Sequence, residues 1–142
     1  MNLIRNSPSI GLMRTFMFGG PVTQTVKTLI AANIGVFLLQ IISHMLGSHA
    51  IDLYFGLVPI RVTRELMLWQ FVTYMFLHGG VFHIFFNMLT LFMFGNDLNR
   101  YWGTRRFLTY YFIAGIGAGF CSWLVAINSW SIVIGASGAI YG

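Results

Sequence analysis

Long runs of apolar residues, separated by short polar segments, dominate the pattern along this chain. The first run, Thr28 to Leu46, has nineteen residues, which at a rise of about 1.5 Å per residue roughly covers the hydrocarbon core of a bilayer. Further runs follow, and each is punctuated by polar residues or glycine. We therefore expect transmembrane helices at about residues 28–46, 82–101, 105–127 and 135–142 onward, with an external loop at 47–80.

Two polar residues interrupt the first apolar run. Asn33 and Gln40 are seven positions apart, so they lie on nearly the same face of a helix. Either this face turns toward neighbouring helices and away from lipid, or the helix simply tolerates two polar residues. In the loop that follows, Trp69 and Tyr74 suit the level of the lipid headgroups, or belong to an ordinary aromatic belt without a function of its own.

Small residues collect in the third and fourth apolar segments. The pair Gly138 and Gly142 has the GxxxG spacing, and such residues allow helix backbones to approach closely. The third run holds several more of them: Ala114, Gly115, Gly117, Ala118 and Gly119.

Composition agrees with this picture of an all-α, polytopic membrane protein. Hydrophobic residues make up 57% of the chain and charged residues only 8%, which favours a bilayer as its surroundings over water. The formal charge of +5 does not indicate nucleic acid binding, because the basic residues form no stripe and accompany no aromatic nucleic-acid motif.

The positions of the basic residues predict a topology. By the positive-inside rule, residues 1–27, with Arg5, Arg14 and Lys27, and the segment that carries Arg100, Arg105 and Arg106 face the cytoplasm. Residues 28–142 then form one partial membrane domain. The second and fourth helices run in the same direction, which places His83 and Ser137 at a similar depth.

Ser137 is the best candidate for a nucleophile. It lies in Gly135-Ala136-Ser137-Gly138, where the glycines remove side chains at a place that a substrate backbone must approach. The start of a helix there leaves free N–H groups that suit an oxyanion hole. Taken alone the motif is a weak signal, since small residues in membrane chains mostly serve helix packing.

A second polar pair, His83 and Asn87, has helical i, i+4 spacing, so both side chains share one face. They could serve as two oxyanion donors, and His83 could also be the general base for Ser137. The structural alternative is a satisfied buried histidine and an interhelical amide. His78 either braces the loop or belongs to the site, and we favour bracing. The i, i+5 spacing of the two histidines, with no Cys, Asp or Glu nearby, argues against a metal.

These motifs together resemble the N-terminal part of a rhomboid intramembrane serine protease. The resemblance covers most residues from Trp69 to Gly142. It rests on H-x4-H-x3-N, here His78, His83 and Asn87, on G-x-S-G at Gly135 to Gly138, and on Gly103-Thr104-Arg105-Arg106-Phe107 with Tyr110 and Tyr111.

The resemblance implies a role for each residue of these motifs. Ser137 is the nucleophile, and the side chains of His83 and Asn87, with the Ser137 backbone N–H, stabilise the oxyanion. Tyr141 matches a tyrosine that packs against the catalytic histidine. That histidine is the general base and belongs to the sixth helix of the family, so the resemblance replaces His83 in this role.

The resemblance also implies a six-helix core, of which this chain holds three helices and the opening of a fourth. Without the dyad histidine, we expect residues 1–142 alone to be inactive. The full-length parent is expected to cleave transmembrane protein substrates in the inner membrane of a bacterium, with no metal or organic cofactor. The chain departs from the common pattern at Gln70, where many members have arginine, and at Asn99, where many have glutamate.

Three other classes of protein stay open. An inactive rhomboid-like protein would bind transmembrane clients without cutting them. A transporter or channel is less consistent with the sequence, which shows no inverted repeat and no carboxylate inside a membrane span. A purely structural helix-packing protein explains the glycines and leaves His83, Asn87 and Ser137 without a role.

Overall fold

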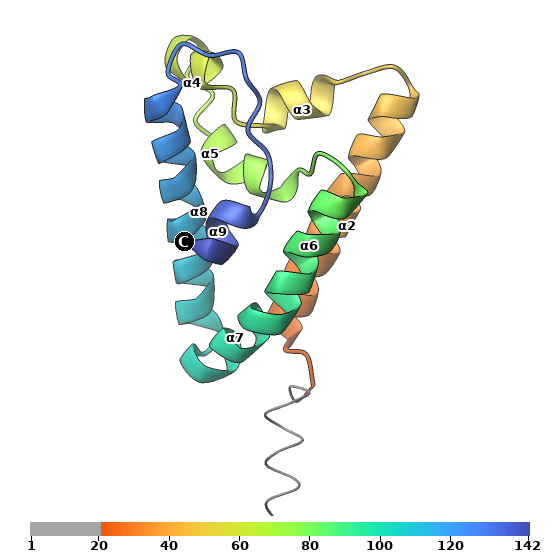
Figure 1. The fold of residues 1–142 in the computed structure, drawn as a ribbon, viewed down its shortest axis with the longest axis vertical. Helices are drawn as coiled ribbons and strands as arrows, with labels where there is room; N and C mark the ends of the chain where they lie inside the picture. The colour runs from red at the N-terminus through yellow and green to blue at the C-terminus, as the bar shows by residue number, and fades with distance from the viewer. Residues whose placement is uncertain (1–20) are drawn as a thin grey trace, which may run out of the picture.

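The computed structural model describes residues 21–142, and these residues form an all-α membrane fold. Figure 1 shows the helices in chain order. Their bounds are α2 Gln24–Met45, α3 Ala50–Phe55, α4 Pro59–Glu65, α5 Gln70–Thr73, η1 Tyr74–Phe76, α6 Val81–Thr90, η2 Leu91–Gly95, α7 Asn96–Trp102, α8 Thr104–Val125 and α9 Ser137–Tyr141.

Three helical stretches in the described part are long and apolar enough to cross a membrane. They are α2, the continuous stretch Val81–Trp102 that joins α6, η2 and α7, and α8. Most of their surface is not covered by other parts of the chain, and large apolar side chains such as Leu38, Phe86 and Ile113 are exposed on it. Apolar surface of this kind is favoured in a bilayer, where it meets lipid or other membrane helices.

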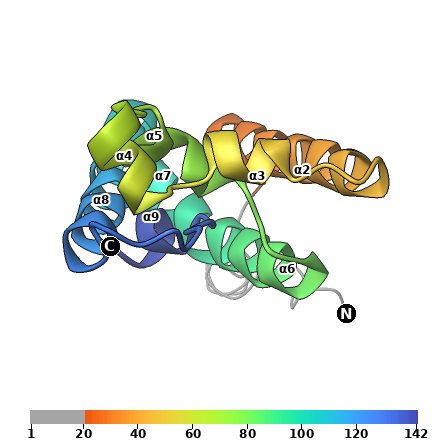
Figure 2. The same cartoon turned by 90° about the horizontal axis from the view of Figure 1, so that it is seen from above.

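The spans form two arms that meet at one end of the molecule. In Figure 1, α2 and α6 run along one edge and α8 runs along the other, while α7 crosses between them. The view from above in Figure 2 shows the same separation, and α9 lies in the space between α8 and α6. The short helix that carries Ser137 is therefore held between two membrane spans.

The fourth helix begins later than the sequence suggested. We expected it from residue 135, but α9 starts at Ser137. The reason is Gly135, whose φ of +125° is incompatible with a right-handed helix and is readily adopted only by glycine. The third span similarly ends at Val125, two residues before the expected boundary.

The two polar residues of the first span face the protein interior. Asn33 is 0% exposed and Gln40 is 1% exposed. The amide of Asn33 donates to the carbonyl of Leu29 at 2.7 Å, and that of Gln40 donates to Asp52 at 2.6 Å. This confirms that their common face turns away from lipid.

Small residues bring α8 and α9 into close contact, as predicted. A Cβ atom added to Gly138 would lie 2.6 Å from the Cβ of Ala118, and one added to Gly142 would lie 2.5 Å from the Cβ of Ala114. Gly117 is different, because a Cβ atom there would meet no other described residue within 4 Å. The glycines of α8 therefore differ in what they pack against, and only some of them allow the close contact with α9.

The loop at 47–80 is an ordered cap of short helices with its own anchors. Leu57 and Val133 form an antiparallel bridge with N···O distances of 3.0 and 2.9 Å. The buried side chain of Gln70 accepts from the N–H of Val58 at 2.9 Å, so glutamine can anchor this loop at the position where the resemblance led us to expect arginine. Tyr74, which we expect at the level of the lipid headgroups, is buried at 3% exposure, so its side chain contacts protein and does not form part of an exposed aromatic belt.

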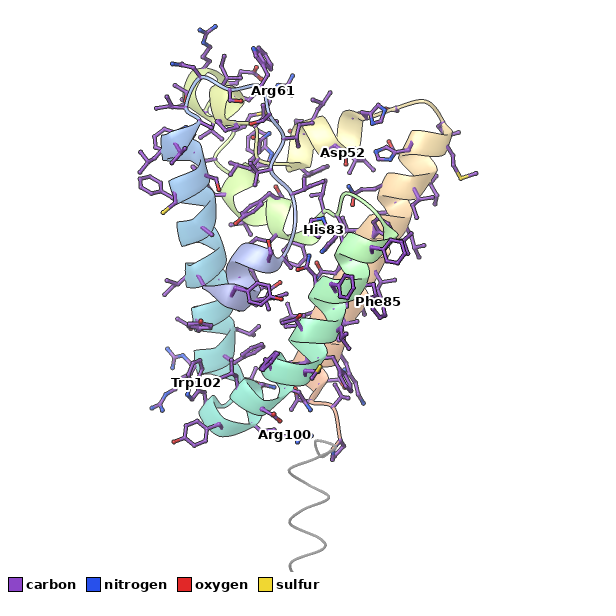
Figure 3. The ribbon with its side chains drawn as sticks, in the orientation of Figure 1. Asp52, Arg61, His83, Phe85, Arg100 and Trp102 are labelled. Atoms are coloured by element: carbon purple, nitrogen blue, oxygen red, sulfur yellow. The ribbon has the colours of Figure 1, made fainter. Side chains whose placement is uncertain are left out.

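Charged residues lie at both ends of the spans. Figure 3 shows Asp52 and Arg61 at the end that carries the cap and Arg100 at the opposite end. Arg5 and Arg14, used in the topology argument, lie outside the described residues.

We predict that Gly115→Val destabilises the full-length protein by about 1–3 kcal/mol, while Gly117→Val does not. A Cβ atom at Gly115 would lie 2.4 Å from Cε of Met75 and 3.1 Å from Cβ of Ala139. The two variants make the same change in helix propensity, so their difference isolates packing. Unfolding in detergent measures it, and equal stability of the two variants would contradict the assigned contact.

Candidate functional site

The candidate site lies where the start of α6 meets the segment that enters α9. His83 and Asn87 occupy successive turns of α6. Their side chains are on the face that meets Gly135. In Figure 3 His83 lies near the start of α6, on the side of the molecule that carries the cap.

The backbone of Gly135 comes unusually close to both side chains. A Cβ atom added to Gly135 would lie 2.7 Å from Nε2 of His83 and 3.7 Å from Nδ2 of Asn87. Any side chain at this position would collide with the imidazole, because real Cβ contacts essentially never fall below 3.0 Å. Glycine is therefore required here for space as well as for its φ angle.

The backbone of Gly135 is held in place by Tyr74. The N–H of Gly135 donates to the carbonyl of Tyr74 at 2.9 Å. The phenol of Tyr74 donates to the carbonyl of Gly115 in α8 at 2.6 Å, and burial raises the pKa of this phenol, which keeps it protonated as a donor. Sequence reasoning missed this role, because a tyrosine in an apolar loop gives no signal that its two ends contact α8 and residue 135.

A hydrogen bond determines which nitrogen of His83 carries the proton. The N–H of Gly79 donates to Nδ1 of His83 at 3.2 Å, so Nδ1 acts as an acceptor and the neutral ring holds its proton on Nε2. Nε2 is the atom that faces Gly135. His83 thus presents an N–H donor toward the site.

Asn87 adds a second donor on the same face of α6, and the side chains of His83 and Asn87 together form a donor wall. Its side chain is 4% exposed, and Nδ2 has no hydrogen-bond partner among the described residues. A buried amide without a partner costs free energy of about 1–3 kcal/mol. Such an atom is suited to donate to an acceptor that reaches the site.

Ser137, Gly138 and Tyr141 take different positions around this wall. Ser137 is exposed at the first position of α9, while Gly138 is placed against Ala118 of α8. Tyr141 projects toward α6, where its hydroxyl lies 3.2 Å from Oγ1 of Thr90. The contacts of the described residues thus join His83 and Asn87 to Gly135, two positions before Ser137.

His78 is a buried neighbour of the wall. Its ring packs edge-on against His83, with centroids 5.2 Å apart. Its backbone is held on both sides by Gln40, which accepts from the N–H of His78 at 2.9 Å and donates to its carbonyl at 3.3 Å. Gln40 therefore anchors the backbone of His78, while neither ring nitrogen has a hydrogen-bond partner among the described residues, and the bracing role of the side chain stays a prediction.

Chemically, the arrangement offers N–H donors from two side chains next to a backbone turn and an exposed hydroxyl. This combination suits stabilisation of negative charge on an oxygen at a reacting carbonyl. It does not suit proton abstraction by His83, because the nitrogen that faces Gly135 is the protonated one.

Comparison with known proteins identifies the family to which this chain is similar. The family described as Rhomboid domain matches residues 65–142. Rhomboid protease AarA from Providencia stuartii is 32% identical over 130 residues, which cover 81% of this chain and 46% of that protein.

Other similar proteins come from eukaryotes. RHOMBOID-like protein 5 from Arabidopsis thaliana is 32% identical over 87 residues, covering 61% of this chain and 28% of the relative. Rhomboid-like protease 3 from Toxoplasma gondii is 33% identical over 75 residues, covering 53% and 28%. The chain therefore spans less than half the length of each of these relatives.

We predict that the full-length protein loses stability on acidification through His78. Burial, and then the nearby His83, lowers the pKa of His78 from 6.5 to about 4. The unfolded state therefore binds more protons between these values, and stability falls as the pH drops from about 6.5 to 4 and levels off below.

The decrease in the free energy of unfolding that is attributable to His78 is at most about 3 kcal/mol. It is measured as the difference in pH-dependent unfolding between the wild type and His78→Leu, which lacks the titrating group. Identical pH profiles of the two proteins would contradict this assignment.

Proposed function

The chain belongs to the rhomboid family, and from this premise we propose that the full-length protein is an intramembrane serine protease with Ser137 as its nucleophile. The observation that carries the proposal is the wall formed by His83 and Asn87 against Gly135. Its two donors face the segment that leads directly into Ser137.

In this proposal Ser137 attacks the scissile carbonyl and forms an acyl-enzyme. The negative charge that develops on the carbonyl oxygen is stabilised by Nε2–H of His83, Nδ2–H of Asn87 and the backbone N–H of Ser137. Preorganised donors are effective because they need no rearrangement when charge develops. The bond from Gly79 to His83 and the burial of Asn87 hold both side chains ready.

The general base is assigned to a histidine outside residues 1–142, as the family resemblance implies. Two observations support this assignment over His83. The Nδ1 atom of His83 already accepts from Gly79 at 3.2 Å, and its other nitrogen is protonated in the neutral ring. His83 would need the opposite tautomer to accept the proton of Ser137.

The substrates that we propose are transmembrane proteins, which reach the site from the bilayer or its surface. The spans carry exposed apolar side chains, and Ser137 is exposed among the described residues. In this proposal water reaches Ser137 to hydrolyse the acyl-enzyme. We place the basic end of the spans, with Lys27, Arg105 and Arg106, in the cytoplasm of a bacterial cell.

We predict that Ser137→Ala in the full-length protein abolishes cleavage of a transmembrane substrate, with a loss of several orders of magnitude in rate. The matched control is Ser131→Ala, since Ser131 is an exposed serine of the same segment whose hydroxyl contacts Ser129 at 2.9 Å. We expect the control to cleave normally. Cleavage that persists in Ser137→Ala would remove this residue from the mechanism.

A fluorophosphonate probe tests the same hydroxyl without a substrate. We expect it to modify Ser137 in the full-length protein and to leave Ser137→Ala and residues 1–142 alone unmodified, because activation of the hydroxyl requires the base. Absence of both labelling and cleavage in the full-length protein would favour the alternative of an inactive rhomboid-like protein that binds transmembrane clients.

We predict that Asn87→Ala lowers kcat by about 10²–10³-fold with little change in KM, because an oxyanion donor acts mainly in the transition state. Asn99→Ala is the matched control. Asn99 is also buried, and its amide donates to Thr23 at 2.7 Å near the opposite end of the span. We expect that control to lower stability without a selective effect on kcat. Equal kcat values for the two variants would exclude Asn87 from the oxyanion site.

A further inference from the structure

Away from the proposed active site, the C-terminal end of α2 and the start of α3 bring together two imidazoles and a carboxylate. Nε2 of His44 lies 2.5 Å from Oδ2 of Asp52, and Nδ1 of His49 lies 3.7 Å from the same oxygen. These potential ligand atoms all lie within 4.8 Å of one another. Proteolysis as proposed above gives this group no role.

The turn between the two helices creates the grouping. Gly47, with φ of +73°, reverses the chain after α2, and its N–H donates to the carbonyl of His44 at 2.9 Å. The N–H of Ser48 donates to the carbonyl of Ser43 at 2.9 Å, which closes the helix end. His49 thereby returns alongside His44, with ring centroids 4.6 Å apart.

Asp52 is held as ligand carboxylates usually are. The residue is 8% exposed, and Gln40 donates to Oδ1 at 2.6 Å, which leaves Oδ2 directed at the imidazoles. Hydrogen bonds of this kind orient a ligand and are a regular part of metal sites. A carboxylate this buried, next to two imidazoles, is a stronger indication than acidic residues at an open surface.

Access to the group is open from water. The side chains of His44 and His49 are 41% and 71% exposed, and they line a cavity of about 490 Å³ together with Gln40, Asp52 and His78. In Figure 3 Asp52, a residue of α3, lies at the capped end of the spans. A dissolved ion and the water molecules that complete its shell have room here.

We propose that His44, His49 and Asp52 bind a divalent transition-metal ion, with Zn²⁺ as the ion that the ligands suit best. Two imidazoles and one carboxylate are typical protein ligands of zinc, and a water molecule completes a tetrahedral shell. Two nitrogen ligands disfavour Mg²⁺ and Ca²⁺, which prefer oxygen. Ligand bonds of roughly 2.0–2.1 Å separate neighbouring ligand atoms by roughly 3.3 Å in a tetrahedral shell, so the exposed His44 ring must move slightly outward.

The metal would be connected to the proposed active site through Gln40. This side chain donates to Asp52 and also holds both backbone groups of His78, and the next residue, Gly79, donates to His83. A metal that fixes Asp52 therefore stabilises the end of α2 against the loop that orients His83. The metal site itself stands independently of the protease proposal.

The test is Zn²⁺ binding to the full-length protein in detergent, after removal of metals with a chelator. We expect one equivalent of Zn²⁺ that raises the Tm, because an ion that binds only the folded protein stabilises it. Co²⁺ in place of Zn²⁺ should give the visible absorption of a four-coordinate site. These readouts do not depend on proteolysis, so they can fail or succeed separately from it.

Variants of the ligands make the assignment specific. His49→Ala alters a largely exposed side chain, and Asp52→Asn keeps the shape of the carboxylate, so both are expected to fold. Each should weaken Zn²⁺ binding by at least about tenfold. His83→Ala, the histidine control, should still bind one equivalent of Zn²⁺. Absence of stoichiometric binding in the wild type, or equal binding in wild type, His49→Ala and Asp52→Asn, would overturn the proposal.

Discussion

The candidate site depends on one close approach, that of the Gly135 backbone to the imidazole of His83. Two elements far apart in the sequence can meet at this distance only because residue 135 has no side chain and adopts a φ of +125°. The same conformation prevents the helix from starting earlier, so Ser137 becomes its first residue. A single backbone constraint thus sets both the distance from the donor wall to the Gly135 backbone and the position of the Ser137 hydroxyl.

Tyr74 connects the close approach of Gly135 to the rest of the fold. Its carbonyl holds Gly135, and its phenol reaches α8, against which α9 also packs through small residues. The cap is anchored in turn by the bridge between Leu57 and Val133. Because lipid supplies little driving force for helix association, such hydrogen bonds and close backbone contacts have to define the geometry.

The sequence allowed much of this architecture to be predicted, because hydropathy and motif spacing are local signals. The three spans, the buried face with Asn33 and Gln40, and the close contact of α8 with α9 all follow from periodicity and residue size. The roles of Tyr74 and Gln70 do not, since each depends on partners that only the folded cap brings near. The His44, His49 and Asp52 group escaped for the same reason: its members are divided between a helix end, a turn and a second helix, so no single periodicity joins them.

The tautomer of His83 depends on a hydrogen bond in the fold and cannot be inferred from the spacing of the motif. From spacing alone, a histidine near a serine is as suitable for a base as for a donor. The N–H of Gly79 favours the donor role that we propose, because a neutral ring that accepts at Nδ1 carries its proton on Nε2. That N–H belongs to a loop fixed by Gln40, which also holds Asp52. The hydrogen bond that fixes the tautomer of His83 therefore comes from a loop that is held by Gln40, the same buried side chain that orients the carboxylate of Asp52 in α3.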